Sequence, residues 1–413
     1  MASSQTPNIV ALERNIGLIP VHQGLAGAYV WIPVFVFFTR SRFDLDGALL
    51  LASLYYLFVV VLEVPSGWMS DRLGRVLTLR VAAVMWVGAQ TCFVLGDDRF
   101  VVIMAGQFLL AAGFASLSGT DVTFHYDTLE ALGRADTFAQ RQARVVSIGY
   151  VVSAMSAVTG GLLGLVDVRW AFLLSGVLAM AQLAVTMRLF EPPATSHAEP
   201  LLRQLRTCIG YLGDRYLGWI FFYGIVMVTL EHVAFTIMQP WLTEVLDRTA
   251  DDLGSTPVLA GVLYATTALV GALAARFSAT VAERVGVVVT LVGLGALSAV
   301  IVTGMALWAH FGLLALVALR SVQGAAAPVL ISAAVAPRTA RQHRATLLSM
   351  NSLAGRLGYG LVLLFVAGGA SDDVRGVLRT LSVIAWALVA LLVVTAALRR
   401  TEAGTPRRDT KAE

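Results

Sequence analysis

Residues 63–75 read EVPSGWMSDRLGR and separate two long apolar stretches of the chain. The first stretch ends with a single acid, Glu63, and the next stretch begins at Val76. The Gly, Asp and Arg residues between them must therefore lie in a very short loop. Short polar loops between apolar helices are typical of proteins that cross a membrane, and such a loop is a natural position for a gate.

The composition of the chain also indicates a membrane protein. Of its 413 residues, 57% are hydrophobic and only 14% are charged, and the mean hydropathy is +0.77. Apolar stretches of about 20 residues recur along the chain, and a helix of that length crosses roughly 30 Å of hydrocarbon. The stretches do not alternate as the strands of a β-barrel would. The predicted fold class is therefore an all-α integral membrane protein.

Charged interruptions divide the apolar stretches into about twelve predicted transmembrane helices, at residues 15–39, 48–68, 76–95, 100–129, 143–166, 169–190, 216–243, 256–278, 286–308, 311–335, 345–368 and 376–398. With this division, 21 basic residues fall on one side of the membrane and 7 on the other. Because basic residues accumulate on the cytoplasmic side, we expect both termini in the cytoplasm. The predicted location is the cell membrane, as a multi-pass protein.

The longest polar interruption inside the chain lies near its middle and predicts a linker between two similar halves. The run DRLG at 71–74 recurs as ERVG at 283–286, 212 residues later, and Gln107 corresponds to Arg320, 213 residues later. Two nearly equal shifts support an internal duplication. The predicted organisation is a cytoplasmic N-terminus (1–14), a six-helix bundle (15–190), a cytoplasmic linker (191–215), a second, pseudo-symmetric six-helix bundle (216–398) and a cytoplasmic tail (399–413).

This pattern resembles the major facilitator superfamily over essentially the full length of the chain. The signature loop of that family, Gly-x-x-x-Asp-Arg-x-Gly-Arg between the second and third helices, is matched by Gly67, Asp71, Arg72, Gly74 and Arg75. The resemblance implies a transporter in which this loop closes the cytoplasmic side and acts as a conformational switch. It further implies contacts of Asp71 with the start of the eleventh helix.

Other parts of the sequence refine the resemblance. Arg75 is expected to contact an acid such as Asp127 or Glu130, which we include in the predicted gate. The residues Glu63-x-Pro65 and SGTDVTFHYDTLEALGR, at 118–134, look like a bacterial, efflux-type branch of the superfamily.

The chain also departs from the proton-driven drug antiporters of the superfamily. Gln107 stands where many members carry an Arg in the fourth helix, and residues 156–164, SAVTGGLLG, lack the Gly-Pro pair of the fifth helix. An Arg-x-x-Gln-Gly sequence occurs instead at 320–324, in the tenth predicted helix.

Four acids fall within the predicted helices: Glu63, Asp121, Asp127 and Glu231. A charge in hydrocarbon costs at least about 2.5 to 3.5 kcal/mol, so each acid should face a cavity or a partner. Glu231, beside His232, is predicted near the midplane, and this pair is the best-placed candidate for proton coupling. Glu63 is a proton site or gate partner in one interpretation and a structural cap of the loop in the other.

Asp121 and His125 are four residues apart and would share a helix face, which suits a paired contact. Asp121 lies about 30 Å along its predicted helix from Phe100, near the cytoplasmic boundary. That depth favours gate chemistry, and Asp121 also remains a candidate for proton coupling. Asp127 and Glu130 are predicted at the cytoplasmic interface, with a solvated helix end as the alternative.

Five residues are candidates for lining a substrate cavity: His22, Gln23, Arg320, Gln323 and Arg356. His22 and Gln23 lie at a depth comparable to the midplane acid, although an isolated intramembrane His is as often structural. The two arginines need counter-charges, which a buried acid or an anionic substrate would supply.

The leading hypothesis for function is secondary active export of a small amphipathic molecule by proton-coupled antiport with alternating access. The alternative is proton-coupled uptake of a metabolite or organic anion on the same fold, and a membrane enzyme is disfavoured. The sequence has no phosphate-binding Gly-x-x-x-x-Gly-Lys loop, so direct use of ATP is not expected. We expect no cofactor, no metal and no nucleic-acid partner, but a small-molecule substrate, protons and the lipid bilayer around a monomer.

Overall fold

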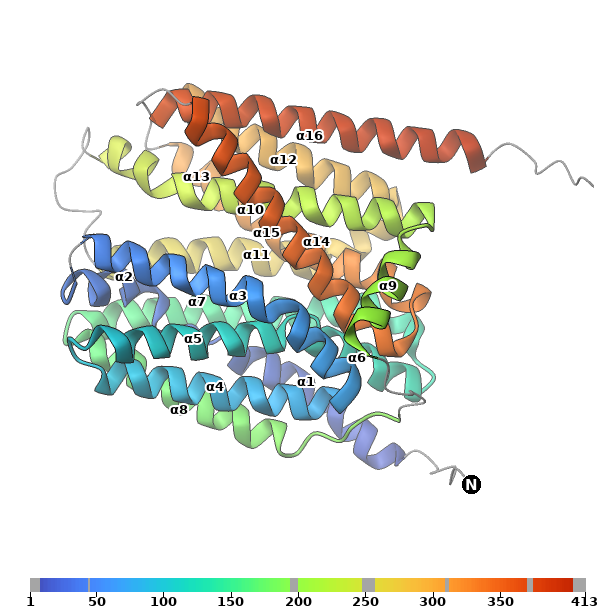
Figure 1. Ribbon diagram of the computed structural model, residues 1–413, viewed down its shortest axis with the longest axis horizontal. Helices are drawn as coiled ribbons and strands as arrows, with labels where there is room; N and C mark the ends of the chain where they lie inside the picture. The colour runs from blue at the N-terminus through green and yellow to red at the C-terminus, as the bar shows by residue number, and fades with distance from the viewer. Residues whose placement is uncertain are drawn as a thin grey trace, which may run out of the picture.

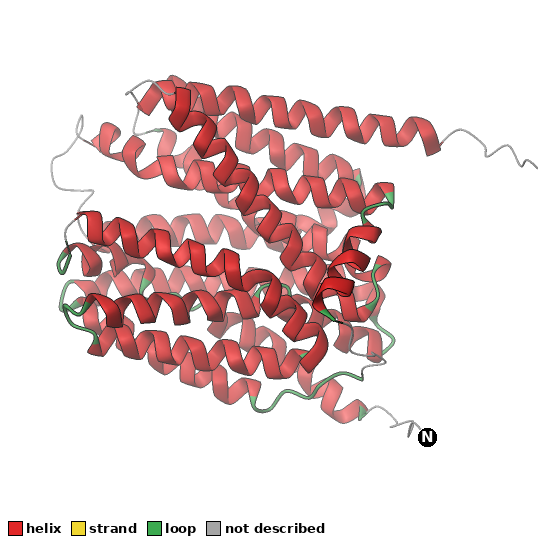
Figure 2. Ribbon diagram, viewed as in Figure 1, coloured by secondary structure: helices red, strands yellow, loops and turns green. Residues whose placement is uncertain are grey.

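The computed structural model describes residues 8–43, 45–193, 200–246, 257–308, 312–369 and 374–403. These residues form helices joined by loops, and no strand occurs among them (Figure 2). The helices before residue 200 are α1 (Ile9–Ala26), α2 (Ile32–Arg40), α3 (Leu45–Leu73), α4 (Arg75–Leu95), α5 (Phe100–Leu117), α6 (Thr120–Ala131), η1 (Ala135–Thr137), α7 (Phe138–Gly164) and α8 (Val168–Thr186). Those after it are α9 (Leu201–Tyr211), α10 (Arg215–Leu246), α11 (Pro257–Val285), α12 (Val287–Leu307), α13 (Leu313–Ala318), α14 (Arg320–Val335), η2 (Ala336–Arg338), η3 (Arg341–His343), α15 (Arg344–Gly369) and α16 (Val374–Ala403).

Most of the long helices run side by side, and α15 crosses the others obliquely (Figure 1). The start of α1, the end of α16 and the short helix α9 all lie at the same end of the bundle. We call this end, which carries Arg75, Arg134, Arg341 and Arg344, the basic end.

Seven helical stretches among the described residues are long and apolar enough to cross a membrane: Arg75–Leu95, Phe100–Ala131, Ala135–Gly164, Val168–Thr186, Gly261–Val285, Val287–Leu307 and Arg375–Leu398. Each of the twelve predicted transmembrane helices coincides with one helix or with a broken pair of helices. The multi-pass, all-helical fold class is therefore confirmed, whereas the number twelve and the domain boundaries stay predictions.

Three of the predicted continuous helices are interrupted. The first breaks between α1 and α2, the fourth breaks at Ser118 and Gly119, and the tenth breaks at Leu319. Gly119 has φ +73°, a left-handed conformation that glycine adopts without strain. No charged residue lies within any of these breaks, so a division of the chain at charged interruptions cannot reveal them.

The two halves of the chain have separate hydrophobic cores. The core of the first half is centred on Phe38, Phe93 and Phe172, whose rings lie within 4.5 to 6.1 Å of one another. The core of the second half is built from residues between Cys208 and Ala396 and includes the stacked pair Trp219 and Tyr223.

Small residues join the two halves along α7 and α11. Ala154 and Ala157 of α7 pack against Ala265 and Ala268 of α11. Small side chains let helix backbones approach closely, and this is how helices associate in lipid, where burial of apolar surface drives little.

The break between α1 and α2 also lies directly against α7. A Cβ atom on Gly160 would lie 1.9 Å from the carbonyl oxygen of Val30. The absence of a side chain at Gly160 therefore allows the contact that places the first helix pair.

We predict that Gly160→Ala destabilises the protein by about 1–3 kcal/mol, because α7 must move away from Val30. Gly293→Ala is the matched control: no atom lies within 4 Å of the added Cβ, and alanine favours a helix over glycine by about 1 kcal/mol. Thermal unfolding in detergent should show a lower midpoint for Gly160→Ala and an equal or higher one for Gly293→Ala. Equal midpoints for the two variants would contradict the close contact assigned to Gly160 and Val30.

Candidate functional site

Asp71 lies at the basic end, where α3 meets the start of α15. Its side chain is buried, and Oδ2 accepts hydrogen bonds from the backbone N–H of Thr346 at 2.9 Å and from the Thr346 hydroxyl at 2.6 Å. Thr346 is in the first turn of α15, where N–H groups lack partners within the helix and the helix dipole favours a negative charge. The contact predicted between Asp71 and the eleventh predicted helix is therefore present.

Arg75 connects this contact to the rest of the basic end. Its guanidinium, 1% exposed, donates to Asp71 Oδ1, to Asp127 Oδ2 at 3.3 Å and to the backbone carbonyl of Arg341 at 2.6 Å. A buried guanidinium is tolerated only when its donors and its charge are matched. The contact predicted between Arg75 and Asp127 is also present.

Asp127 of α6 carries the contacts onward to the second half. Arg344 donates to Asp127 Oδ1 at 2.5 Å, and Arg341 Nε lies 3.0 Å from Asp127 Oδ2. Arg344 also binds both carboxylate oxygens of Glu130, each at 3.1 Å. We call Asp71, Arg75, Asp127, Arg344 and Thr346 the latch, because they join the two halves by direct polar contacts.

The other predicted gate residues have different positions. Arg72 is exposed, and its guanidinium lies over the Trp68 ring at 4.8 Å, so it is not among the latch contacts. Gly67 faces α15, where a Cβ would lie 2.7 Å from Ser349 Oγ. Gly74 lies at the N-cap of α4. Its φ of +106° is a conformation that glycine adopts without strain, and the sharp turn between α3 and α4 requires it.

The linker contributes to the latch through residues that the sequence did not single out. Gln204 of α9 is 3% exposed, and its amide lies within hydrogen-bond distance of Asp71 Oδ2 (2.8 Å), the Gln342 carbonyl (2.7 Å) and Thr346 Oγ1 (2.9 Å). Glu191 caps the start of α4 by accepting from the backbone N–H groups of Arg75 (3.0 Å) and Val76 (2.7 Å). The polar linker thus covers the latch.

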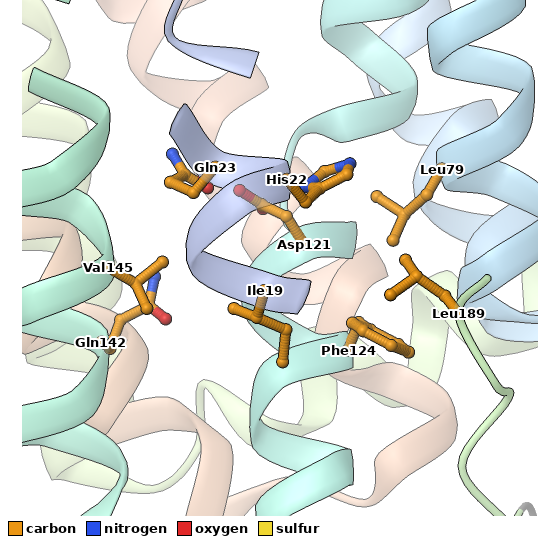
Figure 3. Close-up of a pocket in the computed structure, with 9 residues that line it drawn as sticks. All are labelled: Ile19, His22, Gln23, Leu79, Asp121, Phe124, Gln142, Val145 and Leu189. Carbon is orange, nitrogen blue, oxygen red and sulfur yellow. The ribbon is translucent and has the colours of Figure 1, made fainter. Parts of the chain in front are cut away.

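His22, Gln23 and Asp121 lie together in a small pocket within the first half (Figure 3). The pocket holds about 10 Å³ of free volume, which is room for about one water molecule. His22 is 3.4 Å from Gln182 Nε2. Glu231 does not line this pocket, and the roles of His22 and Gln23 in a substrate cavity stay predictions.

The predicted pair of Asp121 and His125 does not form. His125 Nδ1 lies 2.6 Å from Gln142 Oε1 instead, and Asp121 accepts from the backbone N–H of Val122 at 2.7 Å. Because α6 is a separate helix after the break at Gly119, its side chains are rotated relative to a continuous helix. Asp121 is ten residues, about 15 Å, from the end of α6, so it lies deeper than expected.

Glu63 is the acid that the structure relocates most. The helix α3 continues to Leu73, so Glu63 lies ten residues, about 15 Å, inside it, close to mid-depth of the bilayer. Its side chain is 0% exposed, and Oε1 accepts from the Ser118 hydroxyl at 2.5 Å. Oε2 lies 3.5 Å from Arg356 Nη2 of α15, so the pair joins the two halves.

Glu231 lies at the middle of α10, sixteen residues, about 24 Å, from its start at Arg215. Its carboxylate faces Gly324, where a Cβ would clash with it, and it interacts electrostatically with Tyr150 and Tyr223. Among the described side chains, Glu231 has no hydrogen bond or ion pair. The side chain of His232 lies outside the described residues.

The remaining cavity candidates separate into different environments. Arg356 pairs with Glu63 and not with Glu231. Arg320 lies close to Tyr150 and Tyr264. Gln323 is buried and accepts from Ser298 of α12, so it faces a neighbouring helix.

A model of the Major Facilitator Superfamily matches residues 23–249, which is 227 of the 413 residues. The chain belongs to the Major Facilitator Superfamily. Membership in this superfamily and the helical fold identify a multi-pass membrane transporter. The family predicted from the signature loop is thereby confirmed, while the efflux-type branch and bacterial origin stay predictions.

Solved structures of superfamily members share the fold at low sequence identity. A variant of the E. coli fucose:proton symporter FucP is 13% identical, covers 94% of this chain and 99% of its own, and has a TM-score of 0.68. The human organic anion transporter MFSD10 is 15% identical, with coverage of 92% and 98% and a TM-score of 0.66. A mutant of the nucleoside transporter NupG is 14% identical, with coverage of 93% and 99% and a TM-score of 0.65. No curated protein sequence matches the chain.

We predict that Arg75→Gln opens the basic end and that the matched variant Arg72→Gln does not. Losing hydrogen bonds to charged groups costs about 1.5 to 3 kcal/mol, which corresponds to roughly 10- to 100-fold in population. The reporter is Ser349→Cys, because Ser349 is buried against Gly67 across the two halves. The two native cysteines, Cys92 and Cys208, are replaced by alanine.

Maleimide labelling of the reporter should then be at least about tenfold faster with Arg75→Gln. With Arg72→Gln the labelling rate should equal that of the reporter variant with an unmodified latch. An equal increase of the labelling rate in both variants would contradict the assignment of Arg75 to the latch and of Arg72 to the surface.

Proposed function

We propose that this superfamily member is a proton-coupled secondary transporter that alternates access to a site between its two halves. The observation that carries the proposal is the distribution of polar contacts across the interface of the halves. Reversible hydrogen bonds and ion pairs hold the halves together at the basic end, in the latch. Charged residues are buried at mid-depth of the same interface, where a structural role alone would favour apolar side chains.

The positive-inside prediction makes the basic end cytoplasmic. In this orientation the described conformation is closed toward the cytoplasm, since Asp71, Arg75 and Asp127 are all buried in contacts with the second half or its partners. Breaking the latch would open the cytoplasmic route to the mid-depth site. This gives the gate residues a role in switching and not in substrate contact.

For proton coupling, Glu231 is our proposed carrier. It lies in the middle of a membrane helix, and its carboxylate has no ion-pair partner among the described side chains. A carboxyl group with these surroundings can hold a proton in one conformation and release it in another. Asp121, in its enclosed pocket with His22, is the second proton-coupling candidate.

Two directions of transport are each favoured by one observation. Export by antiport is favoured by Glu231, because a carboxylate with no ion-pair partner among the described side chains can hold a proton and a cationic substrate in alternation. Uptake of an organic anion is favoured by Arg356, a cation at mid-depth. Both use the same fold and the same latch.

Transport into inverted and right-side-out vesicles with an imposed pH gradient tests coupling and direction. The probes are ethidium, an amphipathic cation, and benzenesulfonate, an anion that stays ionised. Proton-coupled export predicts that ethidium accumulates only in inverted vesicles with release of protons. Proton-coupled uptake predicts that benzenesulfonate accumulates only in right-side-out vesicles.

We predict that Glu231→Gln lowers gradient-driven transport at least about tenfold, because the amide cannot take up a proton. The matched control is Glu283→Gln, since Glu283 is an exposed acid of the second half that accepts from Gln140 at 3.1 Å. Transport by Glu283→Gln should equal that of the wild type. Intact proton-coupled transport by Glu231→Gln would show that another group carries the proton.

A further inference from the structure

The ion pair between Glu63 and Arg356 differs from the latch in how well its groups are satisfied. In the latch, Asp71 and Arg75 each make several hydrogen bonds. At mid-depth, Glu63 Oε2 is 3.5 Å from Arg356 Nη2 and has no hydrogen-bond partner among the described residues. Arg356 Nε is likewise buried without a partner. Buried polar groups are rarely left unsatisfied without a reason, so this pair has capacity for a further ligand.

The depth of Arg356 in the protein indicates what surrounds its guanidinium. Arg356 is twelve residues, about 18 Å, from the start of α15 at Arg344, too deep for its guanidinium to reach the membrane surface. Its side chain is nevertheless 23% exposed. An arginine at this depth faces a water-filled space or a ligand and not hydrocarbon. The exposed part of Arg356 therefore points into the space between the halves.

Two tyrosines of α3 lie near the same guanidinium. Tyr55 and Tyr56 of α3 lie close enough to Arg356 to interact with its charge, and Tyr359 of α15 lies beside Tyr56. The rings of Tyr55 and Tyr56 pack edge to face, with centroids 5.5 Å apart. A guanidinium with aromatic side chains nearby suits a flat, amphipathic molecule with an anionic group.

We infer that Arg356 binds the carboxylate of an amphipathic organic anion, and that Glu63 releases Arg356 by taking up a proton. This inference rests on the proposed proton-coupled function, names its substrate class and makes Glu63 a second proton site beside Glu231. Before binding, Glu63 is anionic and Arg356 is cationic. Afterwards, Glu63 is neutral and the substrate carboxylate faces Arg356, so the net charge of the buried site is zero in both states. A neutral substrate would leave a buried charge unpaired, and a cationic one would add a charge.

Few other charges act on Glu63. The described groups that face it are Arg356 from α15, Tyr55 from its own helix and the uncharged Ser118 from the end of α5. Asp71, the nearest acid of the latch on α3, is eight residues, about 12 Å, further along the helix. Among the described residues, Arg356 is therefore the charged group in direct contact with Glu63.

Binding measurements on the purified full chain test the inference. The probes are benzoate, benzylammonium and benzyl alcohol, which share a ring and differ in charge. Benzoate should bind at least about tenfold more tightly than the other two, with uptake of about one proton per benzoate bound. Because binding requires the proton, the affinity for benzoate should fall about tenfold per pH unit once Glu63 is ionised in the free protein.

Variants separate the two roles. Arg356→Gln should weaken benzoate binding at least about tenfold, and Arg356→Lys should weaken it less, since Lys keeps the charge but not the bidentate geometry. Glu63→Gln should bind benzoate without proton uptake and without the pH dependence. The control Arg338→Gln, at an arginine that donates to the Ala334 carbonyl at the basic end, should behave as wild type.

A wild-type preference for benzylammonium, or a pH dependence unchanged by Glu63→Gln, would overturn the inference. These outcomes do not depend on whether Arg356→Gln folds. The measurements also need no pH gradient, so a failure of gradient-driven transport would refute the proposed function and leave the anion site standing. Equal binding of the three probes, with gradient-driven transport intact, would refute the anion site and leave the proposed function standing.

Discussion

The rest of this structure depends on the burial of Arg75 and the carboxylates around it. A guanidinium in a low-dielectric interior is tolerated only when its charge is matched and its donors are bonded. Here Asp71 and Asp127 supply the charge, and Thr346 and Arg344 extend the contacts to the second half. Removing any one group leaves its partners buried and unsatisfied. Such mutual dependence favours breaking and forming these contacts together, as a gate requires.

The mid-depth pair follows a different rule. Glu63 and Arg356 cross the same interface, but their separation is 3.5 Å and both retain unused hydrogen-bonding capacity. A tightly satisfied contact favours one conformation, whereas a loosely satisfied one can be taken over by a ligand. The interface thus combines a tightly bonded set of contacts at the basic end with a loosely bonded pair at mid-depth, and our proposal of alternating access rests on this combination.

The two turns that carry the repeated DRLG and ERVG sequences have similar backbones but different surroundings. Gly74 and the equivalent Gly286 have nearly the same backbone conformation, with φ +106° and +91°, so both halves retain the sharp turn. At the first turn, the buried Arg75 contacts Asp71, Asp127 and the Arg341 carbonyl. At the second, Glu283 makes an exposed hydrogen bond to Gln140 of the first half. The two turns thus share a backbone conformation, while the buried charged contacts lie at the first.

The sequence by itself determined the all-helical membrane fold class, the superfamily and the contacts of Asp71 and Arg75 with their predicted partners. These follow from local properties, namely the length of apolar stretches and one contiguous motif. Only the tertiary structure decided that Glu63 meets Arg356, that His125 turns from Asp121 to Gln142, and that Gln204 covers the latch. Glu63 and Arg356 are 293 positions apart, and their meeting depends on how two independently packed bundles face each other. Neither hydropathy nor helical periodicity specifies that arrangement.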